Sequence, residues 1–459
     1  MGYLRRAGLN TGLTSIETLT TGRYPTGKGP YEATSIKDVD VEHLAETFDY
    51  ERLQVGFDVA KDQHFVCLMG PHWEDYYIFR FDAREEMDRL TGLLEGLPAD
   101  EIRCALEPTG TYGEPLRAEL ERHGFEVRQM NSKKCGQAQE LFDDVPSLHD
   151  GKSAYLVARL SLMELSDAWE KRPDRDRKLR AILREYRDAD TRIDRLTGRM
   201  EALLARFWPE VTVELDLRTA TLQELIAEYG AASEVAADPE GVRETIRRVS
   251  RGNVGAERVE TILELARETT GVEPTSREVE ELKRVAGQMR EAEAELRRCR
   301  RELEEVVDAA GEEDRDSEIG RLREFGGVQL AATLVGELGA PSEYDSAAAY
   351  EKAAGLNLKE KSSGHHQGQP RITKQGPGAV RHNLFMLACR RIQSGRWGCR
   401  YIRAWYQERL RRNGKVRLKA LVAVMRKLIR ALYHIGRGAV YDPHKLFDVS
   451  RLDVRPSTT

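Results

Sequence analysis

Residues 51–69, ERLQVGFDVAKDQHFVCLM, decide the fold of the first part of the chain. The run from residue 53 to residue 60 is mostly apolar, and its Val and Phe side chains favour a β-strand. The polar residues 61–63 predict a tight turn, and a second apolar run follows from His64 to Met69. The pattern predicts a β-hairpin that carries one carboxylate, Asp58, inside its first strand.

Strands and helices alternate after this hairpin. We expect a third strand at residues 76–81, a helix at 83–94, a fourth strand at 102–106, a helix through Leu116 and Leu120, a fifth strand at 125–130, a helix at 132–142 and a helix opening at Asp150. This order predicts an α/β domain with a mixed sheet.

The chain divides further by composition. Residues 1–48 are rich in Thr, Gly and Ser, and we expect them to form a flexible N-terminal extension or a loosely docked one. We assign them no function. The other expected parts are the α/β domain at 49–170, a helical and coiled-coil region at 171–318, a mostly helical C-terminal domain at 319–447 and a tail at 448–459. Within the C-terminal domain, residues 325–339 read as a glycine turn followed by a helix. This is typical of a helix-hairpin-helix element, whose backbone amides can hold a phosphate.

Residues 278–307 predict a long amphipathic helix, because apolar side chains recur at helical spacing among dense mixed charge. Residues 174–207 have a similar pattern, and residues 212–272 between them predict a small helical bundle. The apolar seam requires a partner helix. Two partners fit equally well: the other long helix in an intrachain hairpin, or a second chain in a dimerisation arm. We expect dimers or larger assemblies through residues 278–307.

The net charge of −5 hides a strong asymmetry. From Lys361 to Val440 there are 19 Lys and Arg residues and one acid, Glu408. Such a segment indicates contact with a polyanion, and solvated basic helix faces are the alternative.

Other features narrow the class of protein. No run approaches the ~18 apolar residues of a membrane span. The first residues, MGYLRRAGLNTGLTS, lack the apolar core of a secretory signal. The six cysteines form no CxxC pair, which excludes a disulfide framework and a zinc ribbon. We therefore expect a cytoplasmic protein with no membrane partner.

Three acids stand at the ends of expected elements: Asp58 in the first strand, Glu107 after the fourth strand and Asp150 at the start of a helix. If the first and fourth strands are neighbours, Asp58 and Glu107 lie at the same edge of the sheet. The helix that begins at Asp150 can then bring the third acid to this edge. Carboxylates from three elements suit Mg²⁺ or Mn²⁺, and metal sites of this kind assist phosphoryl transfer. Each acid also has an alternative structural role: Asp58 as a turn former, Glu107 as a surface acid and Asp150 as a helix N-cap. The order of the three is that of ribonuclease H-like domains.

A Gly-, Ser- and Lys-rich loop is expected at residues 361–378. Ser362 and Ser363 stand directly before Gly364. The cations around them, which are candidate nucleic-acid-binding residues, are Lys361, Arg371, Lys374 and Arg381. An exposed hydroxyl among cations can attack a phosphate, although most Ser-Ser-Gly segments are turns.

Together these segments resemble the insertion-sequence transposases that combine a DEDD, RuvC-like nuclease domain with a C-terminal serine-bearing transposase domain, the bridge-RNA-guided recombinases. The resemblance covers most of residues 51–440. It is carried by VGFDVAKDQH (55–64), ALEPTGTYGEPL (105–116), HDGKSAYLVARL (149–160), FGGVQLAATLVGELG (325–339), AAGLNLKEKSSG (353–364) and GQPRITKQGPGAVRHNLFMLA (368–388).

The resemblance implies an RNase H-like domain and a DNA transposase or recombinase that cuts and rejoins strands. It implies that Ser363, or failing that Ser362, forms a covalent serine–DNA intermediate, and that Asp58, Glu107 and Asp150 hold Mg²⁺ or Mn²⁺ beside the phosphate. It further implies donor and target DNA, a structured noncoding guide RNA, and homodimers that assemble to tetramers.

One position departs from the family pattern, which has two aspartates three residues apart at the start of the last helix. Asp150 matches the first, but Ser153 occupies the second. Three carboxylates can form the site, or Asp143 or Asp144 can contribute from the preceding loop. The alternatives in function are a metal-dependent junction-resolving nuclease and a non-catalytic nucleic-acid-binding protein with a decayed site.

Overall fold

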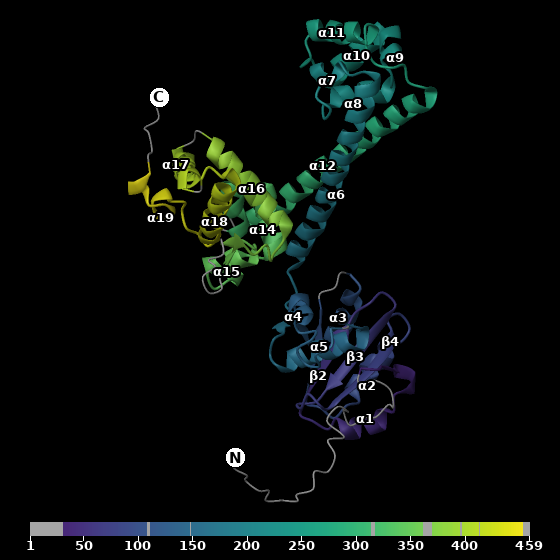
Figure 1. The fold of residues 1–459 in the computed structure, drawn as a ribbon, viewed down its shortest axis with the longest axis vertical. Coiled ribbons are helices and arrows are strands. Elements are labelled where there is room, and N and C mark those ends of the chain that lie inside the picture. The colour runs from purple at the N-terminus through teal and green to yellow at the C-terminus, as the bar shows by residue number, and fades with distance from the viewer. Residues whose placement is uncertain are drawn as a thin grey trace, which may run out of the picture. The chain divides into compact units, whose positions relative to one another are not determined.

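The computed structural model describes residues 31–107, 111–146, 148–313, 317–360, 370–394, 397–412 and 414–452. The chain divides into two compact units, residues 1–171 and residues 172–459 (Figure 1), each with its own hydrophobic cores. No helix within the described ranges is long and apolar enough to cross a membrane.

The first unit is built on a seven-stranded mixed sheet with the strand order β1-β4-β3-β2-β5-β6-β7. The strands are β1 (Thr34–Ser35), β2 (Arg52–Asp58), β3 (Gln63–Met69), β4 (Tyr76–Asp82), β5 (Glu101–Leu106), β6 (Glu126–Gln129) and β7 (Asp167–Ala168). The helices are α1 (Val41–Thr47), α2 (Met87–Glu95), α3 (Gly113–Arg122), α4 (Ser132–Gln137) and α5 (Asp150–Leu162). β2 pairs antiparallel with β3 and parallel with β5, which confirms the expected hairpin and the expected neighbouring strands.

The sheet separates two hydrophobic cores, because side chains alternate between its faces along each strand. On one face, Leu53, Val55 and Phe57 of β2 are fully buried in a cluster with residues of α2 and α3. On the other face, α5 packs against β2 and β3. Burial on both faces explains the nearly continuous apolar sequence of β2.

Gly56 lets α5 lie directly on β2. A Cβ atom at this position would lie 2.3 Å from the amide nitrogen of Ala158 and 2.4 Å from the carbonyl oxygen of Ala154. Further along α5, the Ser161 hydroxyl donates a 3.0 Å hydrogen bond to Oε1 of Gln54. Since α5 thus runs opposite to β2, its first turn lies towards the end of β2.

The N-terminal boundary of this unit differs from the expected one. The structure folds residues 31–48 into the unit, so the prediction of a flexible extension is wrong for them. β1 pairs parallel with β4, and the side chains of Ile36, Leu44 and Phe48 are almost fully buried. A few apolar side chains suffice to dock this polar segment on the core, and they form no periodic pattern. Residues 1–30 lie outside the described ranges.

Two expected helices are shorter in the structure. The helix expected at residues 83–94 begins at Met87, because Oδ1 of Asp82 accepts hydrogen bonds from the amides of Arg84 (2.8 Å) and Glu85 (3.1 Å) and holds a turn. The helix expected at 132–142 ends at Gln137. Both differences lie at helix ends, where local hydrogen bonds compete with helix formation.

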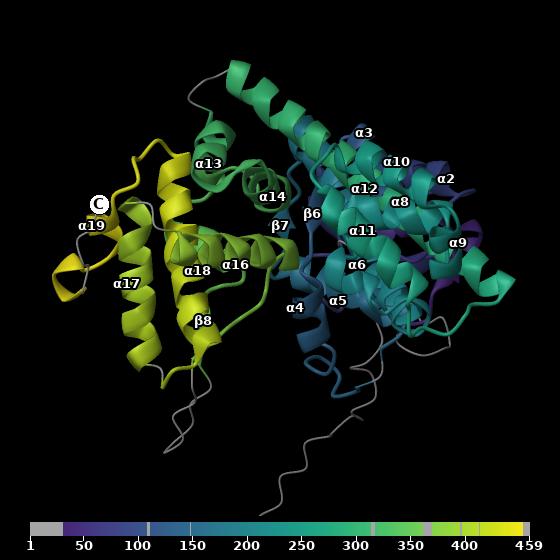
Figure 2. The ribbon, with the colours of Figure 1, turned by 90° about the horizontal axis from the view of Figure 1, so that it is seen from above.

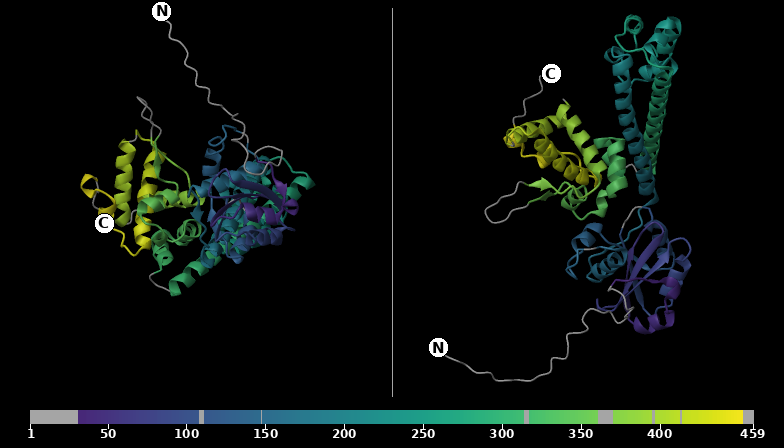
Figure 3. Two further views of the ribbon diagram at one scale, coloured as in Figure 1. Left: turned by 90° about the horizontal axis from the view of Figure 1, so that it is seen from below. Right: turned by 45° about the vertical axis from the view of Figure 1, so that its right-hand side comes forward.

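The second unit contains an arm of two long helices, α6 (Asp174–Phe207) and α12 (Ser276–Glu313), visible in Figures 1 and 3. Ion pairs join the helices at Glu185–Arg298, Arg192–Glu295 and Arg206–Glu278. Residue numbers rise on α6 as they fall on α12, so the two helices are antiparallel. The distal ends are connected by a bundle of α7 (Val211–Glu214), α8 (Ala220–Glu228), α9 (Ala232–Ala237), α10 (Pro239–Ser250) and α11 (Ala256–Arg267), which confirms the predicted bundle.

The apolar seam of α12 is covered by helices of the same chain. Its side chains at Leu282, Val285, Met289, Cys299 and Leu303 are almost fully buried in clusters that also contain residues of α6. The intrachain hairpin is therefore formed. Because α6 covers these five side chains of the seam, they do not by themselves call for a second chain, and assembly through residues 278–307 stays a prediction.

The remaining helices pack around the proximal end of the arm (Figure 2). They and the short strands between them are α13 (Glu318–Gly326), α14 (Val328–Leu338), α15 (Ala347–Ala353), β8 (Leu358–Lys359), β9 (Arg371–Ile372), α16 (Gly378–Gln393), α17 (Trp397–Arg412), α18 (Arg417–Gly436) and α19 (Pro443–Leu446). Leu179 and Leu183 of α6 belong to the same buried cluster as α14 and α18. The expected boundary at residue 318 thus lies inside one compact unit. Gly327, with φ of +89°, forms the expected glycine turn between α13 and α14.

We expect Gly56→Ala to destabilise the first unit strongly, by about 3 kcal/mol or more, because the new methyl group meets backbone atoms that cannot rotate away. Thermal unfolding of the full chain measures the effect. Gly92→Ala in α2 is the matched control, since no atom lies within 4 Å of its added Cβ. Equal melting temperatures for the two variants would contradict the close packing of α5 on β2.

Candidate active site

The parallel pairing of β2 and β5 brings two acids to one edge of the sheet. Phe57 pairs in register with Leu106, so the residues that follow them, Asp58 and Glu107, stand on adjacent strands. Asp58 is still within β2, where it pairs with Phe65 of β3, and it is therefore not a turn former. Like Gly56 two residues before it, Asp58 faces the side of the sheet covered by α5.

α5 brings the third acid to the same edge. Two strand residues advance about 6.7 Å and one helical turn about 5.4 Å, so the helix and the strand run past one another nearly in step. The contact between Gly56 and Ala154 therefore places the preceding turn of α5, which contains Asp150, near the end of β2. Asp150 is the first residue of α5, and His149 is the N-cap residue, so the N-cap alternative for Asp150 is wrong.

The three carboxylates influence one another electrostatically. Burial, followed by the negative charges of Asp150 and Glu107, raises the pKa of Asp58 to about 6. Neighbouring like charges oppose ionisation, and a bound cation would relieve this repulsion. The site thus concentrates negative charge at the carboxyl ends of two parallel strands.

Cys135 of α4 is a neighbour of this site that the sequence analysis did not single out. Its side chain is buried and hydrogen-bonded to Glu107, and burial together with this bond raises the pKa of the thiol. The thiol consequently stays protonated at neutral pH and donates to the carboxylate. A lone cysteine without a CxxC partner gives no signal in the sequence for such a role.

The donor set fits a hard divalent cation, because carboxylate oxygens are the ligands that Mg²⁺ and Mn²⁺ prefer. In the described ranges, however, no three His, Cys, Asp or Glu side chains are arranged so that they could hold one metal ion. The acids are close enough to shift the pKa of Asp58 without standing in ligand geometry.

Asp143, the suggested substitute for a fourth acid, is engaged elsewhere. Its Oδ1 accepts a 2.9 Å bond from Nζ of the buried Lys152, and its Oδ2 accepts a 3.0 Å bond from the hydroxyl of Tyr31. Both oxygens thus hold the loop before α5 in place. Ser153 lies on α5 three residues after Asp150, on the same face of the helix, where it supplies a hydroxyl instead of a carboxylate.

Tyr31 connects the N-terminal segment to this loop. Besides its bond to Asp143, its carbonyl oxygen would lie 2.2 Å from a Cβ atom at Gly151. The segment to which we assigned no function therefore packs on the first turn of α5. Nothing in its Thr- and Gly-rich composition indicates this contact.

The serine-bearing segment belongs to the second unit. Ser362, Ser363 and Lys361 lie outside the described residues. The two ends of the segment are joined by β8 and β9, which pair antiparallel with Lys359 opposite Arg371. The Thr373 hydroxyl donates a 2.5 Å bond to Oδ1 of Asn357, just beyond these strands. β8 and β9 therefore form the base of a hairpin, which we call the serine hairpin, and this base is held by the strand pairing and by the bond between Thr373 and Asn357.

The expected nucleic-acid-binding cations differ in their surroundings. Arg371 and Lys374 are exposed at the base of this hairpin. The Arg381 guanidinium instead donates a 2.6 Å bond to the carbonyl oxygen of Gly376. A Cβ atom at Gly376 would lie 2.1 Å from the carbonyl oxygen of Ala353, so the chain passes very closely here. Arg381 thus stabilises the base of the hairpin.

Comparison with known families agrees with this geometry. Residues 55–209, which contain all three acids, match a family model described as a transposase, the DEDD domain of IS110 transposases. Residues 326–407, which contain Ser363, match the transposase IS116/IS110/IS902 family. The chain belongs to the IS110-type transposases. No curated protein matches it. As an IS110-type transposase, it is an enzyme that acts on DNA, and its RNase H-like α/β domain and helical C-terminal region confirm the predicted fold class.

We expect Asp58→Asn to stabilise the transposase at about pH 8. The folded-state pKa of Asp58 is raised, so its stabilising contribution is complete below its unfolded-state pKa and is lost as the pH rises through about 6. Because the side chain is partly exposed, the gain from removing the charge is about 1 kcal/mol.

Thermal unfolding in the presence of a chelator, from about pH 5 to about pH 8, measures this effect. The advantage of Asp58→Asn should grow with pH, while Asp100→Asn, at an exposed position, should show no such trend. An advantage that is independent of pH would contradict the proximity of the three carboxylates.

Proposed function

We propose that this transposase cuts and rejoins DNA through a covalent bond between Ser363 and a DNA phosphate, assisted by a divalent metal and guided by a structured noncoding RNA. The observation that supports it most is the cluster of three carboxylates at one edge of an RNase H-like sheet, in a chain whose second unit carries a Ser-Ser-Gly hairpin. Both features lie within the matching family models.

Asp58, Glu107 and Asp150 are the proposed metal ligands. When bound, Mg²⁺ or Mn²⁺ would supply Lewis-acid stabilisation of the charge that develops on the phosphate. The chain's own residues prepare the site: the Cys135 thiol orients Glu107, and the mutual repulsion of the acids favours binding of a cation. With Ser153 at the fourth position, we propose that three carboxylates are sufficient.

In the proposed reaction, Oγ of Ser363 forms a bond to phosphorus while the bond from phosphorus to one DNA oxygen breaks. The serine proton is transferred to a basic group, and the departing DNA strand keeps a hydroxyl group. Attack by the hydroxyl of another strand on the phosphoserine then restores the serine and reseals the DNA. The number of phosphodiester bonds is conserved, so the exchange requires no external energy source.

Cations around the hairpin would hold the DNA backbone. Arg371 and Lys374 are exposed at its base, and Lys361 lies within the segment itself. Arg381 contributes by stabilising the hairpin base through Gly376. The excess of 19 basic residues over one acid between residues 361 and 440 suits phosphate contacts to DNA and to a guide RNA. We also propose that several copies of the chain assemble, through a surface other than the α12 seam.

We expect Ser363→Ala to abolish covalent DNA attachment and strand exchange while leaving DNA and RNA binding intact, because only the attacking oxygen is removed. Denaturing electrophoresis of protein mixed with labelled element ends detects the adduct. Ser362→Ala is the matched control and should keep the adduct. Asp58→Asn should lower the rate at least about 100-fold, as expected when charge stabilisation is lost.

The outcomes separate the alternatives. An adduct that forms with Ser363→Ala but not with Ser362→Ala assigns the attack to Ser362. Strand exchange that survives both substitutions would exclude a serine nucleophile and favour a nuclease that uses water. Wild-type rates with Asp58→Asn would exclude the metal site.

We expect one noncoding RNA species to copurify with the chain and to be encoded next to the ends of the host element. Sequencing of the bound RNA tests this. Because phosphate contacts release counterions, the affinity for this RNA should fall at least about tenfold between about 50 mM and about 200 mM salt. Bound RNA of random origin, or an affinity insensitive to salt, would contradict the proposed guide.

A further inference from the structure

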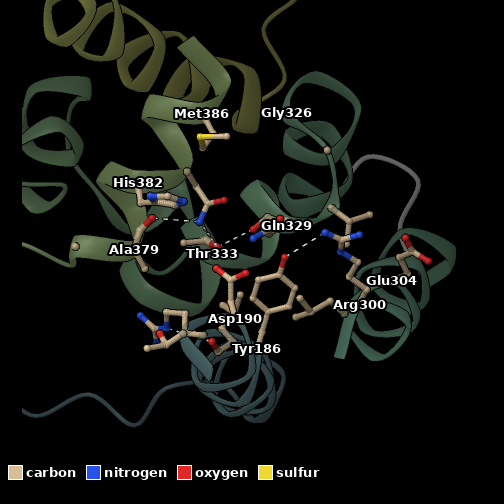
Figure 4. Close-up of a pocket in the computed structure, with 18 of the residues that line it drawn as sticks. Tyr186, Asp190, Arg300, Glu304, Gly326, Gln329, Thr333, Ala379, His382 and Met386 are labelled. Atoms are coloured by element: carbon tan, nitrogen blue, oxygen red, sulfur yellow. Dashed lines mark hydrogen bonds between the residues drawn. The ribbon is translucent and has the colours of Figure 1, made fainter. Parts of the chain in front are cut away.

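A cavity of about 790 Å³ lies in the second unit, at the proximal end of the arm (Figure 4). Its walls come from α6, α12, the turn between α13 and α14, and α16. Binding sites for small organic groups have volumes of roughly 300–1,000 Å³, so the cavity has room for a group the size of a nucleotide.

A side-chain hydrogen bond joins two walls of the cavity, α14 and α16. Thr333 of α14 donates a 2.7 Å hydrogen bond to the carbonyl oxygen of Gln329, and Nδ2 of Asn383 on α16 donates to the Thr333 hydroxyl at 3.2 Å. The same Nδ2 donates to the carbonyl oxygen of Ala379 at 3.1 Å. Of these three bonds, dashed in Figure 4, the bond between Asn383 and Thr333 joins α16 to α14, and the other two lie within their own helices. A preformed site loses little conformational entropy when it binds a ligand.

Several polar side chains lining the cavity have no hydrogen-bond or ion-pair partner among the described residues. They are Asp190, Glu304, Gln329, His382 and Arg390. In Figure 4, Asp190 rises from α6 towards Thr333 and Gln329, while His382 stands on α16 across the cavity. Donors and acceptors that converge on a cavity without partners are available to a ligand.

The lining also combines apolar and cationic surface. Tyr186, Val328 and the exposed side chain of Met386 offer apolar contacts. Arg300 donates a 3.3 Å bond to the Tyr186 hydroxyl, which places its positive charge at the wall beside the ring. A ligand that combines an apolar part, hydrogen-bond donors and acceptors, and a negative charge matches this lining. A nucleotide has this combination.

A second hollow of about 400 Å³ continues past the glycine turn. It shares Gly326, Gly327 and Arg390 with the cavity and extends to Phe325 and Arg391. No atom lies within 4 Å of the position that a Cβ of Gly327 would take, so a ligand can approach the backbone there. The Arg391 guanidinium lies 4.5 Å from the Phe325 ring centroid. Two hollows that share lining residues suit a chain of nucleotides better than a free nucleotide.

We propose that the cavity between α6, α12, α14 and α16 accepts one unpaired nucleotide of a nucleic-acid strand, with Asp190 and Gln329 bonding to the base and Arg390 to the phosphate. The neighbouring nucleotides run through the second hollow along Gly327. The inference rests on the proposed function only in that the chain binds nucleic acid. It requires neither the serine intermediate nor the metal.

The test compares two hairpins that differ by one bulged nucleotide, 2-aminopurine, each made in DNA and in RNA. Binding to the full chain is measured by fluorescence anisotropy, and the 2-aminopurine emission reports its surroundings. We expect the bulged hairpin to bind about tenfold more tightly than the paired one, as one to two additional hydrogen bonds to charged groups allow. If the preference appears with the DNA hairpins, the nucleotide belongs to DNA. If it appears with the RNA hairpins, the nucleotide belongs to RNA.

Two substitutions should remove the preference. Asp190→Asn removes the acceptor for a base amino group, and Met386→Trp fills the mouth of the cavity from an exposed position. Asp188→Asn is the matched control, because it removes the same charge from an exposed position of α6 that does not line the cavity. Every comparison is a ratio of the affinities for two hairpins. A change in the overall charge of the protein alters both affinities in the same way and therefore cancels.

The result that overturns the proposal is equal affinity of the wild-type chain for bulged and paired hairpins, or a preference that survives both cavity substitutions. Equal, salt-dependent binding of both hairpins would leave the proposed nucleic-acid function standing and exclude only the nucleotide site. Failure to bind either hairpin in DNA and RNA would exclude both proposals.

Discussion

The contact between Gly56 and the backbone of α5 is the constraint on which the proposed active site depends. With no side chain at this position, the helix approaches the strand until its amide and carbonyl groups meet β2 directly. The direction of α5 follows from this contact and from the bond between Ser161 and Gln54. Asp150 consequently reaches the edge where β2 and β5 present Asp58 and Glu107. Any residue larger than glycine would move the third acid away from the other two.

The same constraint has an electrostatic cost. Three carboxylates drawn together at a partly buried edge repel one another, and burial together with this repulsion raises the pKa of Asp58. Active sites commonly retain such unfavourable arrangements, because the stored repulsion favours the cation that completes them. The surrounding residues limit the cost: Cys135 donates to Glu107, and the Lys152–Asp143 pair keeps a fourth carboxylate out of the cluster.

In the second unit, the arm of α6 and α12 forms part of the C-terminal core and of the cavity walls. Its proximal end is part of the C-terminal core, since Leu179 and Leu183 of α6 are buried with α14 and α18. The cavity at this end thus has walls from segments far apart in the sequence. Both the arm and the cavity lie in the unit that carries the serine hairpin.

Several features of the chain were determined by its sequence alone. The strands at residues 52–58, 63–69, 76–82 and 101–106 follow from local patterns, because residues buried on both faces of a sheet must be apolar. The three acids could be singled out because each ends or begins an element, and the elements alternate in a familiar order. The long helices, the bundle at the end of the arm and the glycine turn at Gly327 were equally evident from periodicity and from glycine.

Only the tertiary structure decided what depends on contacts between distant residues. Residues 31–48 join the first unit through a few buried side chains that form no periodic pattern. The seam of α12 faces α6 of the same chain, and the periodic pattern alone cannot identify this partner because any apolar helix would bury the same seam. Cys135, Arg381 and the cavity lining acquire their roles from neighbours in space. Local propensity is encoded in short windows of sequence, whereas these roles depend on which surfaces meet after the chain has folded.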